Sequence, residues 1–108
     1  MTQEIFGAKW QDDVKAVAVA NADLELAKSA TETLQVYAVF GGGVASRMMD
    51  NSNFNFAVES GNTSAAVDAS GVVTATTTAG TAVVSVTLKD AAGKATDKVG
   101  YANVTVKA

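Results

Sequence analysis

Apolar and polar residues alternate along most of this chain in short runs, a period-two pattern that predicts half-buried β-strands rather than helices. Turn-forming residues separate the runs. We expect strands over Val14–Val19, Leu24–Leu26, Glu32–Phe40, Phe54–Glu59, Ser64–Asp68, Val72–Thr76, Thr81–Lys89 and Thr96–Val106. A helical turn is the alternative for the second of these segments.

The alternation also predicts which side chains of the longer runs point into the core. The expected inward side chains are Leu34, Val36, Ala38, Phe40, Val84, Val86, Leu88, Ala102, Val104 and Val106. Val83, Ser85 and Thr87 should then face outward, because successive side chains of a strand point to opposite faces.

Glycine-containing segments divide the strands from one another. Gly41–Gly43 ends the second long run, Ser70-Gly71 marks a tight turn, and Asp90–Gly93 has the composition of a four-residue hairpin loop built on a type I turn. Seven or eight short strands with such turns are typical of an antiparallel β-sandwich. A small closed barrel is the alternative.

The segment Thr63–Thr87 carries a motif in three pieces. Ala66-Val67-Asp68 ends a strand of small residues, Ser70-Gly71-Val72-Val73-Thr74 follows, and a long strand begins with Gly80-Thr81-Ala82-Val83-Val84. The motif resembles the group 2 bacterial immunoglobulin-like domain. The resemblance extends over about residues 14–106 and implies an immunoglobulin-like β-sandwich, which we place at residues 14–108.

Elementary geometry gives the motif residues structural roles. Gly71 stands where a tight turn requires a positive φ. Asp68 and Ser70 can hydrogen-bond backbone N–H groups within that turn. Val73 returns the chain to the inward face, and Gly80 reverses the chain before the longest regular strand. These are expectations about the fold, since a fold does not by itself set a function.

Residues 1–13 differ from the rest and form an expected N-terminal arm. They carry Ile5, Phe6 and Trp10, the only tryptophan, without a regular period. Apolar groups outside a core must be buried somewhere. Either the arm folds back on its own domain or pairs as an extra edge strand, or it docks on a partner with Trp10 as the anchor.

Composition narrows the chemistry that the chain can perform. The 108 residues include no Cys, His or Pro, so thiolate and imidazole metal sites, thiol nucleophiles and Ser-His-Asp catalysis are excluded. The polar segment Asp50–Asn55 fails the calcium-loop template, because Phe54 stands where an oxygen ligand is needed. We therefore expect no catalytic residue, metal or cofactor, and hence no enzyme.

Charge and hydropathy limit the partners. The net charge is −3 and the eight basic residues are scattered, which does not suit nucleic-acid binding. No apolar stretch is long enough for a membrane span. The window from Ser60 to Leu88 has one charged residue, Asp68. It predicts a buried central strand or, alternatively, a sheet edge used for assembly.

The resemblance also suggests a setting for the protein. Domains of this family occur on phage capsids and tails, and as repeats in bacterial surface adhesins of the intimin or invasin kind. A single domain, a Met start and no export signal favour a non-enzymatic phage virion protein. Its expected partner is a capsid or tail protein, host-surface carbohydrate is a candidate ligand, and homo-oligomerisation is left open. The alternative is an adhesin repeat on a bacterial cell surface.

Overall fold

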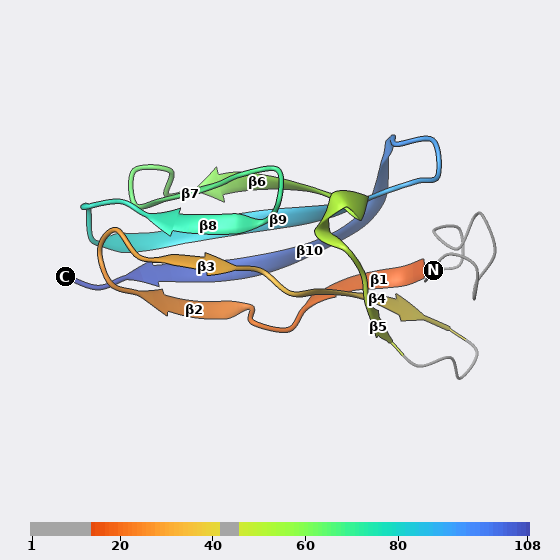
Figure 1. The fold of residues 1–108 in the computed structure, drawn as a ribbon, viewed down its shortest axis with the longest axis horizontal. Coiled ribbons are helices and arrows are strands. Elements are labelled where there is room, and N and C mark those ends of the chain that lie inside the picture. The colour runs from red at the N-terminus through yellow and green to blue at the C-terminus, as the bar shows by residue number, and fades with distance from the viewer. Residues whose placement is uncertain (1–13, 42–45) are drawn as a thin grey trace.

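A computed structural model describes residues 14–41 and 46–108, and they are almost entirely β-strand (Figure 1). The strands are β1 (Val14–Val19), β2 (Asp23–Leu26), β3 (Thr31–Thr33), β4 (Val36–Phe40), β5 (Arg47–Met48), β6 (Phe54–Ser60), β7 (Ala65–Val67), β8 (Val72–Ala75), β9 (Gly80–Lys89) and β10 (Ala95–Val106). One turn of 3₁₀ helix, η2 (Asn51–Asn53), precedes β6.

These strands form two layers, an arrangement consistent with a β-sandwich. The first layer is one sheet in the order β2-β10-β9-β6. The second layer consists of two smaller sheets, β1-β4-β5 and β3-β8-β7. Figure 1 shows β1 beginning at one end of the long axis and β10 ending at the other.

The described residues contain ten strands, whereas the sequence predicted seven or eight. The predicted run from Glu32 to Phe40 is divided at Leu34-Gln35 into β3, which pairs with β8, and β4, which pairs with β1 and β5. The two-residue β5 was not predicted. The helical turn considered for Leu24–Leu26 is wrong, because this segment lies in β2.

The prediction of a purely antiparallel sandwich is also wrong in one place. β2 pairs in parallel with the end of β10, with Asp23 opposite Asn103 and Leu26 opposite Val106. After β1 the chain passes from the second layer to the first without reversing, so β2 continues in the direction in which β10 also runs (Figure 1).

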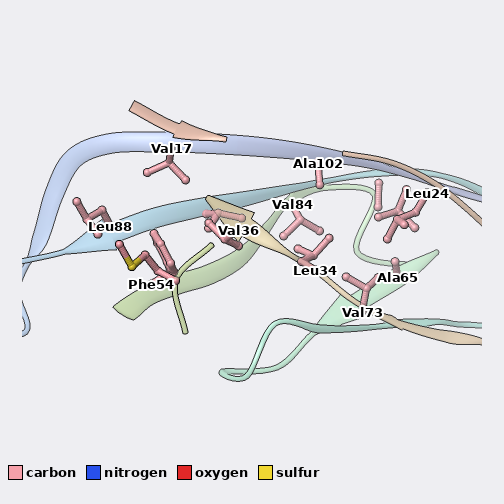
Figure 2. Close-up of a cluster of buried hydrophobic side chains, with 14 of the residues drawn as sticks. Val17, Leu24, Leu34, Val36, Phe54, Ala65, Val73, Val84, Leu88 and Ala102 are labelled. Atoms are coloured by element: carbon pink, nitrogen blue, oxygen red, sulfur yellow. The ribbon is translucent and has the colours of Figure 1, made fainter. Parts of the chain in front are cut away.

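The core lies between the layers, and the period-two pattern predicted it well. All ten of the expected inward side chains are buried, and Val36, Ala38, Val84, Val86, Leu88, Ala102 and Val104 are fully buried. Figure 2 shows side chains from both layers gathered in this space. The outward-facing Ser85 is also buried, because β9 is a central strand and its hydroxyl donates to the Glu59 carboxylate at 2.8 Å.

Candidate functional site

The motif turn between β7 and β8 is held by one carboxylate. Asp68 Oδ1 accepts hydrogen bonds from the Ser70 N–H at 2.9 Å and the Val72 N–H at 3.0 Å. The Gly71 N–H donates to the Asp68 carbonyl at 3.1 Å, which closes the turn. Asp68 therefore fixes the β7–β8 hairpin, and Ser70 presents its carbonyl outward toward the neighbouring segment.

Gly71 occupies a position that only glycine fits well. Its φ is +79°, in the left-handed region that side chains disfavour. A Cβ there would stand 2.7 Å from Asn51 Nδ2 and 2.9 Å from Phe56 Cζ. The turn is thus packed directly against β6 and the segment that precedes it.

The two remaining motif residues have structural positions as well. Val73 is fully buried in β8. Gly80 opens β9, and a Cβ there would stand 2.5 Å from the hydroxyl of the buried Ser64. Ile5, Phe6 and Trp10 of the arm lie outside the described residues.

The second layer divides at Leu34-Gln35, which we call the seam. Two asparagine side chains form hydrogen bonds with backbone groups there. On one edge, Asn51 Nδ2 donates to the Leu34 carbonyl at 3.0 Å and to the Ser70 carbonyl at 2.9 Å. On the other edge, Asn21 Nδ2 donates to the Thr33 carbonyl at 3.0 Å, and its Oδ1 accepts from the Gln35 N–H at 2.9 Å. Asn21 thus donates and accepts as a peptide group of a neighbouring strand would, and Asn51 supplies two donors.

A groove of about 560 Å³ runs along the seam on the Asn51 side. Its walls come from three segments: the β3–β4 junction, the β5–η2 segment and the motif turn. The lining residues are Thr33, Leu34, Gln35, Val36, Met48, Met49, Asp50, Asn51, Ser52, Ala69 and Ser70. The groove therefore brings the motif turn beside residues that are distant in the sequence. Met48 at its rim is 57% exposed.

Asp50 supplies the carboxylate of the groove, and its local bonds stabilise the charged form. The Ser52 hydroxyl donates to Asp50 Oδ2, and the Ser52 N–H donates to the same oxygen at 3.2 Å. These two hydrogen bonds, the hydroxyl first, lower the pKa of Asp50 below its ordinary value of 3.8. The carboxylate caps η2 and stays ionised at neutral pH.

The groove does not have the donor set of a metal site. Asn51, in the segment tested as a calcium loop, directs N–H donors at carbonyls rather than an oxygen at a cation. Within residues 14–41 and 46–108, no three acidic side chains gather as potential metal ligands. The groove offers hydrogen-bonding groups and methionine surface.

Sequence reasoning missed both Asn21 and Asn51. The partners of Asn51 lie 17 and 19 residues away, so its role depends on tertiary contacts. In the sequence, Asn51 stood out only as part of a segment that fails the calcium-loop template, which gave no sign of these partners. The buried central strand that the low-charge window from Ser60 to Leu88 predicted is confirmed, since β9 lies between β10 and β6.

The sequence matches no protein-family model, and a search of curated proteins finds no similar sequence. No helix among the described residues is long and apolar enough to cross a membrane.

Proposed function

We propose that the chain is a non-enzymatic immunoglobulin-like module displayed on a phage particle, on the capsid or the tail. The observation that carries the proposal is the order of the strands. β1, β3–β4, β8 and β7 follow one another across the second layer, and β6, β9 and β10 across the first. If β3 and β4 are counted as one interrupted strand and β2 and β5 as additions, this order supports an ABED and CFG arrangement like that of immunoglobulin sandwiches.

The motif turn supports the same proposal. Asp68 and Gly71 hold the β7–β8 hairpin, and Gly80 opens β9 after the chain has crossed from the second layer to the first. The resemblance to the family therefore rests on residues whose contacts account for their chemical type. The proposed setting follows from that family, whose members are found on phage particles.

The arm provides the proposed attachment to the particle. Residue 13 is joined to Val14, which begins β1 at one end of the long axis (Figure 1). An arm that leaves from this end would hold the domain outward from a capsid or tail surface. Ile5, Phe6 and Trp10 supply the apolar contacts in this proposal, and the seam groove is a candidate site for host-surface carbohydrate.

Particle binding tests the proposal. Phage particles that lack the chain would be mixed with the full chain, with a variant lacking residues 1–13, and with Trp10→Ala and Lys9→Ala variants. We expect the full chain and Lys9→Ala to co-sediment with the particles, and both the truncation and Trp10→Ala to stay in solution. Circular dichroism checks that each variant keeps its β-structure. Particle binding by the truncated chain would show that the arm proposal is wrong.

A second candidate function is supported by a different observation. β1 begins and β10 ends at opposite ends of the long axis, so copies of the domain could be joined end to end (Figure 1). This geometry suits a repeat of a bacterial surface adhesin. The neighbouring coding sequence discriminates: tandem similar domains behind a signal peptide support the adhesin, and capsid or tail genes support the virion protein.

A further inference from the structure

Strand β6 forms an edge of the first layer. It pairs antiparallel with β9 on one side, and the described residues place no strand on its other side. Its regular part runs from Phe54 to Val58, because a bulge interrupts the register between Val58 and Ser60. Figure 1 shows β6 beside β7 at the margin of the molecule.

The alternation of the ladder identifies the backbone groups on this edge. The Asn103 N–H donates to Ala22, on the β2 side, so even-numbered residues of β10 face β9. Their partners in β9 are even-numbered too, so the odd-numbered residues of β9 direct their N–H and C=O groups toward β6. These odd-numbered residues stand opposite Asn55 and Ala57, whose backbone groups therefore point toward β9. The N–H and C=O groups of Phe54, Phe56 and Val58 therefore point to the open side.

The side chains beside this edge are apolar and incompletely covered. Phe56 and Val58 point toward the core but are only partly buried, and Val67 of the facing strand β7 is partly buried as well. The single charge of β6, Glu59, lies beyond the regular part and is drawn over β9 by the Ser85 hydroxyl. The charge that would most directly discourage edge pairing is thus held away from the edge.

The other exposed edges are less suited to pairing. β1 has six residues, but a bulge interrupts its register between Val14 and Ala16, and β10 lies against it: a Cβ at Gly100 would stand 2.7 Å from the Val17 carbonyl oxygen. β5 has two residues and β7 has three. β2 has four residues and presents the charged side chains of Asp23 and Glu25. Short and charged edges are the usual protection against association, and β6 has neither protection over five consecutive residues.

We propose that β6 pairs antiparallel with β6 of a second copy of the chain, about a two-fold axis at Phe56. Phe56 then lies opposite Phe56 of the second copy, and Phe54 opposite its Val58, in hydrogen-bonded pairs. On the outer face, Asn55 lies opposite Ala57 of the second copy. The register is self-complementary, opposes no two charges, and joins two four-stranded sheets into a continuous eight-stranded one.

The occupant is a second copy rather than an arbitrary extended peptide because the stretch complements itself. Aromatic and β-branched residues meet on the inner face, where such cross-strand pairs stabilise a sheet. Small or neutral polar residues meet on the outer face in the non-hydrogen-bonded pair, where the Cα atoms approach to about 4.5 Å.

Charge substitutions on the outer face test the pairing and its register. Asn55 and Ala57 are exposed, so charged side chains there can be accommodated in the monomer. The double variant N55E/A57E opposes glutamates across the two-fold axis, and N55K/A57E opposes each lysine to a glutamate. N103K/T105K, on the exposed outer face of β10 opposite Asp23 and Glu25 of β2, is the control. Sedimentation equilibrium of the full chain measures the dimer dissociation constant for each variant.

We expect the wild-type chain and the control to form a dimer of twice 10.9 kDa. N55E/A57E should weaken the dimer by at least about tenfold, and N55K/A57E should restore it. The pairing is refuted if the wild-type chain remains a monomer, or if N55E/A57E dimerises as tightly as the control. A dimer lost only when residues 1–13 are removed would assign the contact to the arm instead. Circular dichroism confirms that each variant is folded.

Discussion

Replacing Asn51 with alanine tests whether the seam is held by side-chain amides. The change removes two hydrogen bonds, to the carbonyls of Leu34 and Ser70, and leaves the backbone of η2 intact. Each bond contributes about 1 kcal/mol net, so we expect a loss of about 2 kcal/mol in the free energy of unfolding. For a domain of this size that corresponds to a fall in Tm of about 8 °C.

Urea unfolding followed by far-ultraviolet circular dichroism measures this loss, and the m-value should stay constant if only the folded state is weakened. Asn103→Ala is the matched control, because it truncates an exposed asparagine in the middle of β10. We expect the control to change stability by less than about 0.5 kcal/mol. Asn51→Asp should cost more than Asn51→Ala, since it directs a carboxylate at two carbonyl oxygens. Equal stabilities of Asn51→Ala and Asn103→Ala would refute the reasoning.

Three further predictions concern the seam and its turns. Asn21→Ala should lower the free energy of unfolding by about 1–2 kcal/mol in the same assay, since it removes both bonds on the other edge of the seam, and no loss would contradict this. Gly71→Ala should lower the free energy of unfolding by at least about 2 kcal/mol more than Gly93→Ala. Both glycines have a positive φ, but of the two only Gly71 has other atoms where a Cβ would stand. Equal losses for the two variants would show that packing at Gly71 is unimportant. Ser52→Ala should raise the pKa of Asp50 toward 3.8 in an NMR titration. The stabilisation from this lowered pKa is present above the unfolded-state pKa and is lost as pH falls through the folded-state pKa, and an unchanged Asp50 pKa would contradict the assignment.

Local pattern predicted the core because a strand's periodicity is a property of neighbouring residues. Val84, Val86 and Leu88 are buried as the alternation requires. The Asp90–Gly93 loop was equally predictable: the Gly93 N–H donates to the Asp90 carbonyl at 2.9 Å, and Gly93 has a φ of +87°.

The division of the second layer could not be predicted in this way. Leu34 and Val36 continue the same inward alternation across the seam, so the pattern shows no interruption where the pairing partner changes. The change depends on which strands lie alongside, and β5 is too short to have a pattern. The groove follows from this division and was equally hidden from local reasoning.

The parallel pairing of β2 with β10 has a mechanical consequence. The two strands point the same way, and the chain enters β2 from the end where β1 begins, whereas β10 ends at the opposite end (Figure 1). A pulling force applied between the two ends of the domain would therefore load the hydrogen bonds of this pair together in shear, rather than open them one at a time. Because of the position of β2, the hydrogen bonds between β2 and β10 would bear the pulling force between the two ends of the domain.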